Sequence, residues 1–244
     1  MLDRQKFSLG LWNVLSDSQA IRAASPYIDF VIVDLEHGFR NWSEIVSSVL
    51  EARSRSLSVW IRLRSYDDSA VQNLLDLGVF QFIVPQVRHL WQIDNLRSRL
   101  DYPPKGVRGQ HPRASHGFVA ADSTDPIGPV QLCVIFETKS ILAIADEVLD
   151  HSGVDSVYLG TYDLSAELEL PLGPNSPQLE ALLGPVVGKA QSMGKTVIAM
   201  NGDKGILGVW KGLGVRTFVV GIDSEILQSG VQNSILDFES GVEN

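Results

Sequence analysis

Residues Asp29-Phe30-Val31-Ile32-Val33-Asp34-Leu35-Glu36-His37-Gly38 are an apolar, mostly β-branched run that stops on two carboxylates, an imidazole and a glycine. A run of this length and composition is typical of a strand that is buried on both faces. Charged side chains directly after such a strand are held at its end by a rigid scaffold. A single junction of this kind is also compatible with a strand that runs out into a solvated loop, but other strands of this chain end in the same way.

Short β-like runs and helix-length amphipathic segments alternate along the rest of the chain. The expected strands are Ser8–Trp12, Phe30–Asp34, Ser58–Leu63, Phe80–Val84, Gln131–Glu137, Ser156–Leu159, Thr196–Met200 and Thr217–Val220. The expected helices are Ser18–Ala24, Trp42–Ala52, Ser69–Leu77, Leu90–Leu100, Ser140–Leu149, Pro177–Met193, Lys204–Leu213 and Ser224–Asp237. Eight strands, each followed by a helix, predict an α/β fold, a single (β/α)8 TIM barrel over residues 1–244. A doubly wound open sheet is disfavoured because the sequence has no glycine-rich first turn.

The composition is that of an ordinary globular protein with an acidic charge balance. The 244 residues are 44% hydrophobic and 20% charged, and the net charge is −9. An acidic chain without a run of lysine and arginine is a poor candidate for binding nucleic acid or a membrane surface. The sequence shows neither an apolar signal region near Met1 nor a membrane-spanning stretch of about 18 apolar residues. The single cysteine, Cys133, cannot form an intrachain disulfide, so we expect a cytoplasmic protein.

One long irregular segment, residues 101–129, separates the fourth and fifth expected strands. It contains Pro103-Pro104-Lys105-Gly106-Val107-Arg108-Gly109 and Pro112-Arg113-Ala114-Ser115-His116-Gly117. Loops of this length inside a compact domain are usually functional or disordered. Its arginines and histidines favour an ordered lid or a contact between subunits.

Candidate catalytic residues were sought at the carboxyl ends of the strands, where active sites of (β/α)8 barrels lie. The polar or aromatic residues at these ends are Trp12 or Asn13, Asp34, Glu36, His37, Arg62, Glu137, Asp163, Asn201 and Asp223. Carboxylates that converge on one rim repel each other unless a cation lies between them. Glu137 and Asp163 follow adjacent strands, so both could bind one hard cation such as Mg²⁺ or Mn²⁺. Alternatively, Asp163 only caps the next helix and Glu137 pairs with Arg62.

Three further features of the rim point to the chemistry of a small oxygen-rich anion. His37 is the natural general base, because the pKa of an unperturbed histidine lies close to neutral pH. Arg62 offers a fixed cationic fork to a carboxylate or a developing oxyanion, unless it only forms a structural salt bridge. The N–H groups of Thr161-Tyr162-Asp163, at the start of an expected helix, could bind a carboxylate. A 2-oxo acid such as pyruvate fits this site, because a metal can bind it through two oxygens and stabilise its enolate.

Several segments, in this order along the chain, resemble the HpcH/HpaI aldolase family. They are Val33-Asp34-Leu35-Glu36-His37-Gly38, Arg62 with Asp67, Leu75-Asp76-Leu77-Gly78, Val84-Pro85-Gln86-Val87, Tyr102-Pro103-Pro104-Lys105-Gly106-Val107-Arg108-Gly109, Glu137-Thr138 and Gly160-Thr161-Tyr162-Asp163-Leu164-Ser165. The similarity runs from about Leu9 to Leu227. It implies a barrel of the phosphoenolpyruvate/pyruvate-binding type and a class II aldolase that cleaves 4-hydroxy-2-oxo acids, such as 2-keto-3-deoxy sugar acids, to pyruvate and an aldehyde.

The resemblance also implies roles for individual residues. Glu137 and Asp163 would bind the divalent metal (Mg²⁺ or Mn²⁺, or alternatively Co²⁺), and His37 would be the base. Arg62 would contact the keto oxygen, the backbone around Gly160, Tyr162 and Asp163 would bind the pyruvate carboxylate, and Asp34 would shape the aldehyde side. Asp76 would pair with the histidine, but only in a neighbouring subunit, because it lies at the opposite face of its own barrel. Family members are typically homo-oligomers, trimers or hexamers.

The sequence departs from the family pattern at positions that affect substrate choice. Ile135 replaces a glutamine that many members have two residues before the metal-binding glutamate. Thr161-Tyr162 replaces Pro-Ala or Pro-Gly, so a tyrosine would narrow the pocket or add a hydroxyl group. Arg64 stands where many relatives have proline or a small residue. We expect the chemistry to survive these changes, because both metal ligands, the base and the arginine are present.

Three alternative functions remain open from the sequence. A Schiff-base aldolase would need a lysine at a strand end, and Lys139 is the nearest candidate. A citrate- or malyl-type lyase or synthase that uses oxaloacetate or an acyl-CoA shares the acidic ligands, but the basic surface for a CoA phosphate is not evident. A non-catalytic ligand-binding barrel is the third alternative, which Ile135 and Tyr162 leave open.

Overall fold

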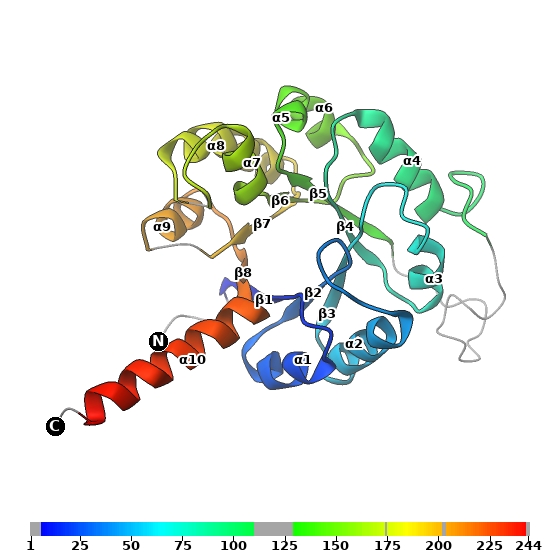
Figure 1. Cartoon of the computed structure of the whole chain (residues 1–244). Coiled ribbons are helices and arrows are strands. Elements are labelled where there is room, and N and C mark those ends of the chain that lie inside the picture. Colours follow the sequence, from blue (N-terminus) through cyan, green and yellow to red (C-terminus); the bar gives the residue numbers. More distant parts are fainter. Residues whose placement is uncertain (1–5, 110–128, 174, 202–203, 243–244) are drawn as a thin grey trace.

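The chain folds into a closed barrel of eight parallel strands, as Figure 1 shows for the computed structural model. The structure describes residues 6–109, 129–173, 175–201 and 204–242. The strands are β1 (Ser8–Asn13), β2 (Phe30–Asp34), β3 (Ser58–Arg62), β4 (Gln81–Val84), β5 (Gln131–Phe136), β6 (Ser156–Leu159), β7 (Thr196–Met200) and β8 (Thr217–Ile222). Each strand pairs with its neighbours in sequence, and β8 closes the barrel against β1. The predicted (β/α)8 barrel is therefore confirmed.

The helices surround the barrel, with one exception (Figure 1). They are α1 (Ser18–Ala24), the 3-10 helix η2 (Ser25–Tyr27), α2 (Trp42–Ser54), α3 (Val71–Asp76), α4 (Leu90–Leu100), α5 (Lys139–Ala143), α6 (Ala145–Asp150), α7 (Thr161–Glu167), α8 (Pro177–Ser192), α9 (Lys204–Gly212) and α10 (Asp223–Val242). The exception is α10, which begins at the end of β8 and projects away from the ring of helices.

The strands are buried on both faces because the core has two layers. Trp12, Phe30, Ile32, Ile135 and Tyr158 belong to the inner layer, which fills the barrel. The larger outer layer packs the opposite faces of the strands against the helices. All five residues of β2 are buried, as the apolar run in its sequence predicted. The functional rim is therefore built on a close-packed scaffold.

The differences between expected and observed elements lie mainly at their ends. The expected helix Ser140–Leu149 is two short helices, α5 and α6, which meet at Ile144, where the backbone leaves the helical region. A further short helix, α7, follows β6 directly. Much of the segment 101–129, interpreted as a lid or subunit contact, lies outside the described residues. No helix in the described ranges is both long enough and apolar enough to cross a membrane.

Candidate active site

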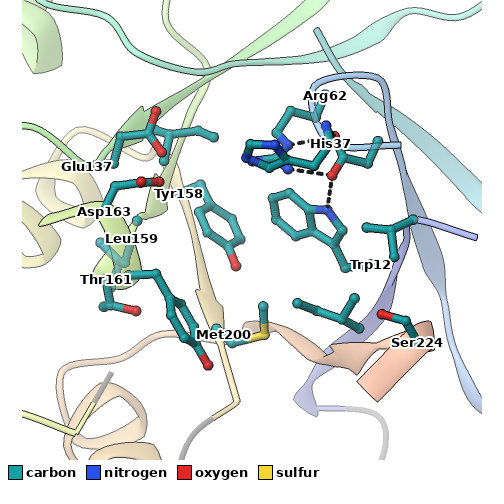
Figure 2. A pocket seen from close by; sticks show the side chains of 16 residues that line it. Trp12, His37, Arg62, Glu137, Tyr158, Leu159, Thr161, Asp163, Met200 and Ser224 are labelled. Atoms are coloured by element: carbon teal, nitrogen blue, oxygen red, sulfur yellow. Dashed lines mark hydrogen bonds and ion pairs between the residues drawn. The ribbon is translucent and has the colours of Figure 1, made fainter. Parts of the chain in front are cut away.

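A cavity of about 410 Å³ opens at the carboxyl ends of the strands. Of the eight residues predicted for the site, seven line it, namely Asp34, His37, Arg62, Glu137, Gly160, Tyr162 and Asp163. These residues follow β2, β3, β5 and β6, so the parallel register of the barrel brings them to one rim. Figure 2 shows the labelled Glu137 and Asp163 on one side of the cavity and His37 and Arg62 on another.

A buried ion pair between Asp34 and Arg62 joins the ends of β2 and β3. The two residues are directly paired in the sheet, and the Arg62 Nε lies 2.9 Å from Asp34 Oδ1 while Nη2 donates to Oδ2. Nη1 lies 2.8 Å from Glu36 Oε2. Arg62 has five N–H donors, so this arrangement leaves donors for a ligand in the cavity. The open alternative that Arg62 pairs with an acid is thus correct, but its partners are Asp34 and Glu36 and not Glu137.

The Asp34 carboxylate is fully buried, with 0% exposure, and both oxygens accept several hydrogen bonds. Besides Arg62, Oδ1 accepts from the backbone N–H groups of Glu36 at 2.9 Å and His37 at 3.3 Å, and Oδ2 accepts from Trp12 Nε1 at 3.1 Å. Burial raises the pKa of Asp34, but the bonds and charge of Arg62, with those of Trp12 and His37, outweigh it and leave the pKa lowered. Asp34 therefore anchors the arginine and the loop that carries His37. Asp34 also lines the cavity, and its role in shaping the aldehyde side stays a prediction.

His37 reaches the cavity from an exposed loop. Its side chain is 68% exposed, and Nε2 lies 4.0 Å from Glu36 Oε2. The pKa of Glu36 is raised by burial, although Arg62 and His37 oppose this effect. A solvent-accessible imidazole beside a carboxylate can exchange protons with both water and a ligand, as a general base must.

The two predicted metal ligands lie at the ends of adjacent strands and face the cavity (Figure 2). Glu137 is only 2% exposed, and its Oε1 accepts a hydrogen bond from the backbone N–H of Gln86. Burial, together with the nearby carboxylates of Asp163 and Glu36, raises the pKa of Glu137 to about 8, although the Gln86 N–H and Arg62 oppose this effect. These acids thus repel one another in the absence of a cation, and a cation bound between them would relieve that repulsion.

The donor set fits a hard divalent cation that keeps open coordination positions. The described part of the chain holds no group of three or more histidine, cysteine or acidic side chains arranged around one ion. A site built on Glu137 and Asp163 would therefore supply two carboxylates and leave the remaining positions to water and substrate. Mg²⁺ is commonly bound in this way, with one or two carboxylates.

Gly160 is required because the end of β6 approaches β5 very closely. A Cβ atom at this position would lie 2.4 Å from the Glu137 Cβ and 2.6 Å from Ile135 Cγ2. The Gly160 N–H donates to the Phe136 carbonyl oxygen at 3.1 Å. This N–H group is therefore already hydrogen-bonded. The predicted hydrogen bonds to the pyruvate carboxylate would have to come from the residues that follow Gly160.

Those neighbours form the first turn of α7. Thr161, Tyr162 and Asp163 are its first three residues, whose N–H groups have no acceptor within the helix. The Thr161 Oγ1 is buried and has no hydrogen-bond partner, and Thr161 lines the cavity. A buried polar atom without a partner is unfavourable unless a ligand or water satisfies it. The turn therefore offers both backbone and hydroxyl donors to a carboxylate.

Asp76 is the one predicted residue that does not line this cavity. It is the last residue of α3, before β4, and it accepts a hydrogen bond from Gln72 Nε2 at 3.0 Å. This position agrees with the expectation that Asp76 could reach only the site of another subunit. Its pairing with a histidine there stays a prediction.

Two residues that contact the charged groups of the site, Trp12 and Gln86, were not predicted from the sequence. Trp12 was noted only as a strand end, yet its ring lies 4.7 Å from the Arg62 guanidinium carbon and its Nε1 binds Asp34. Gln86 was noted only as part of a motif, yet its backbone holds Glu137. Gln86 has a positive φ of 53°, and a glutamine offers no sequence signal for this conformation.

Comparison with known proteins identifies the family of the chain. The family model of HpcH/HpaI aldolase/citrate lyase matches residues 8–207. The chain is 27% identical over 230 residues to a pyruvate aldolase of Rhizobium etli, covering 92% of this chain and 90% of the relative. It is 25% identical over 230 residues to a 4-hydroxy-2-oxo-heptane-1,7-dioate aldolase of Salmonella dublin, covering 92% and 87%.

Comparison with solved structures finds the same barrel fold. The crystal structure of an HpcH/HpaI aldolase from Desulfitobacterium hafniense superposes with a TM-score of 0.87 at 23% identity, covering 98% of this chain and 95% of that one. The family model spans most of the barrel and includes every residue that lines the cavity up to Met200. The chain therefore belongs to the HpcH/HpaI aldolase/citrate lyase family.

Proposed function

We propose that this protein is a metal-dependent pyruvate aldolase, which joins pyruvate to an aldehyde and cleaves the resulting 4-hydroxy-2-oxo acid. The observation that carries the proposal is the pair of converging carboxylates, Glu137 and Asp163, on the same rim as the histidine and the arginine. The names of the Rhizobium etli and Salmonella dublin relatives support the same reaction class.

Substrate binding in this proposal uses the first turn of α7 and the two acids. The N–H groups of Tyr162 and Asp163 and the Thr161 hydroxyl bind the pyruvate carboxylate. Glu137 and Asp163 hold the divalent cation, either Mg²⁺ or Mn²⁺. When bound, the cation supplies positive charge to the oxygens of the 2-oxo acid and offsets the repulsion between the carboxylates.

Proton transfer and bond formation use the opposite side of the cavity. His37 takes a proton from the pyruvate methyl group, and the electron pair left on that carbon forms the new bond to the aldehyde carbon. The aldehyde oxygen gains a proton, so the reaction balances without another reactant. Arg62, fixed by Asp34 and Glu36, keeps free N–H donors for the oxygen that becomes negative.

Exchange of the pyruvate methyl protons with deuterated water tests this function without any knowledge of the aldehyde. The proposal predicts exchange, measured by NMR, that depends on Mn²⁺ or Mg²⁺ and is lost in His37→Ala. The absence of exchange with every divalent ion would overturn the proposed function. Covalent trapping of pyruvate by borohydride would instead support a Schiff base on a lysine.

We also propose that the chain forms a homo-oligomer through α10. This helix projects from the barrel and exposes apolar side chains, including Leu227 at 60% and Phe238 at 71% exposure (Figure 1). Among the described elements α10 contacts mainly β1 and β8, and an exposed apolar face on such a helix is typical of a contact between subunits. Light scattering of the full chain and of Leu227→Glu tests the proposal: the full chain should be an oligomer and the variant smaller. A monomeric wild-type chain would contradict it.

A further inference from the structure

The side of the cavity away from the two acids is apolar. Val14, Met200 and Ile222 line this side, together with the hydroxyl-bearing side chains of Tyr162 and Ser224. Figure 2 shows the labelled Met200 and Ser224 far from Glu137 and Asp163. Because pyruvate is expected at the acidic end, the apolar side is where the substituent of the aldehyde would lie. This side is called the distal wall below.

The Tyr162 ring lies on this wall. It packs against Gly173, where a Cβ atom would lie 3.7 Å from the ring, and the Gly173 φ is +104°. The Gly173 N–H donates to Ser165 Oγ at 3.2 Å, and that hydroxyl donates to the Tyr162 carbonyl oxygen at 2.7 Å. The backbone of Tyr162 is thus linked to Gly173 through Ser165, and its partly exposed ring lies beside Gly173 in the lining of the cavity.

The distal wall lacks a cation that could bind a second anionic group. Among the described residues that line the cavity, only Arg62 and His37 can carry positive charge, and both belong to the reacting end. Arg40 donates to the carbonyl oxygens of Asn13 and Leu15, on either side of Val14, but it does not line the cavity. It donates to Asn13 Oδ1 at 2.6 Å and to Ser48 Oγ at 3.0 Å.

Acidic side chains instead lie next to the wall. Asp223 is buried and accepts hydrogen bonds from the Val14 N–H at 3.0 Å and Asn13 Nδ2 at 2.5 Å. The negative charge of Glu225 also acts on the Tyr162 side chain. An anionic group placed here would lose its hydration and could gain at most the hydroxyl groups of Tyr162 and Ser224, without a counter-charge, and nearby carboxylates would repel it.

We infer that the aldehyde partner of this enzyme carries an uncharged, apolar substituent, and that Met200, Tyr162 and Ile222 select it. This inference rests on the proposed aldolase function. The substrate named for the Salmonella dublin relative is different, since a 4-hydroxy-2-oxo-heptane-1,7-dioate yields pyruvate and an aldehyde that ends in a carboxylate. The distal wall of the present protein offers that carboxylate no counter-charge among the described residues.

A matched pair of aldehydes tests the inference. Butanal and succinic semialdehyde have four carbons each and differ in the terminal carboxylate. With pyruvate and Mn²⁺, we expect kcat/KM for butanal to exceed that for succinic semialdehyde by about 10-fold or more, the range that a single pocket contact provides. A preference for succinic semialdehyde would overturn the inference. Turnover of succinic semialdehyde would leave the proposed function standing, whereas the absence of both turnover with either aldehyde and methyl exchange of pyruvate would overturn both proposals.

Substitution of Met200 tests whether the lack of positive charge on the distal wall causes the expected preference for butanal. Met200→Lys adds a cation at the distal wall. It should lower the ratio of kcat/KM for butanal to kcat/KM for succinic semialdehyde by about 10-fold. Met200→Gln has a similar length and no charge, so it should lower butanal turnover without raising that of the semialdehyde. An equal shift in both variants, with folding checked by circular dichroism, would show that charge does not set the selectivity and would overturn the inference.

Discussion

The backbone N–H of Gln86 donates a hydrogen bond to Oε1 of Glu137 and so links the loop after β4 to the end of β5. Gln86 adopts a left-handed conformation with φ of 53°, which places its N–H toward the carboxylate. A conformation of this kind is unfavourable for residues other than glycine and persists only where its surroundings enforce it. The hydrogen bond that orients Glu137 thus depends on a strained backbone conformation at Gln86.

The strain at Gln86 can be measured with two substitutions that remove the same side-chain amide. Gln86→Gly should keep the left-handed conformation and bind Mn²⁺ as tightly as the wild type within about threefold, since glycine tolerates positive φ. Gln86→Val should be about 1–2 kcal/mol less stable than Gln86→Gly, because a β-branched residue is strained there. Thermal unfolding and Mn²⁺ titration give both values. Equal stability of the two variants would contradict the proposed role of the backbone.

Removal of either converging acid should weaken metal binding strongly. Glu137→Gln and Asp163→Asn each remove one of two carboxylate ligands, so we expect the Mn²⁺ Kd to rise by about 100-fold, comparable to the loss of supporting metal interactions. Electron paramagnetic resonance of free Mn²⁺ measures the Kd directly. Glu167→Gln is the matched control, because Glu167 lies on α7 but pairs with Arg88 at 3.2 Å, outside the cavity. Unchanged Mn²⁺ binding in both site variants would place the metal elsewhere.

The close approach of β6 to β5 predicts the effect of a single methyl group. Gly160→Ala places a Cβ 2.4 Å from the Glu137 Cβ and 2.6 Å from Ile135 Cγ2, so the strand ends must separate. Overpacking of this kind typically costs about 1–3 kcal/mol. We expect a lower urea midpoint and weaker Mn²⁺ binding. In Gly188→Ala, the matched control, a Cβ would meet nothing within 4 Å, and stability should not fall.

The fold and most of the site could be predicted because short stretches of sequence identify the strands and the polar residues at their ends. The run from Phe30 to Asp34 is buried along its whole length, and its charged end reaches the cavity as expected. The register that pairs Asp34 with Arg62, in contrast, depends on neighbouring strands that lie 28 residues apart in the chain. The sequence shows both charges but not that they bind each other, so the anchoring of Arg62 by Asp34 could not be predicted.

Features without a residue-type signal could not be predicted. The positive φ of Gln86 depends on the packing of its loop, and the cation–π contact of Trp12 with Arg62 depends on the twist and register of the barrel. The projection of α10 was not foreseen either, because its apolar pattern is equally compatible with packing on its own barrel. Local pattern identifies the elements, whereas tertiary contacts decide which side chains meet.

Cys133 should be unreactive in the folded protein. It is fully buried in β5, and burial raises the pKa of its thiol to about 12, so that almost no thiolate exists at neutral pH. Modification by a thiol reagent at pH 8 should therefore proceed only as fast as the protein opens, and urea should accelerate it strongly. Mass spectrometry of the single cysteine follows the reaction. Rapid modification without denaturant would show that β5 is accessible.

The buried pair of Asp34 and Arg62 predicts how stability depends on pH. The pKa of Asp34 is lowered in the folded protein relative to its ordinary value of 3.8. Its contribution is therefore fully present above about pH 5 and is lost as the pH falls through 3.8 toward the folded pKa. Asp34→Asn leaves Arg62 buried with a weaker partner, and removal of one member of a buried pair costs about 3–5 kcal/mol. The difference in free energy of unfolding between wild type and Asp34→Asn, from urea titrations at several pH values, should be constant from pH 7 to about 5 and shrink below about 4. A difference that stays constant down to pH 3 would show that the charge of Asp34 does not stabilise the rim.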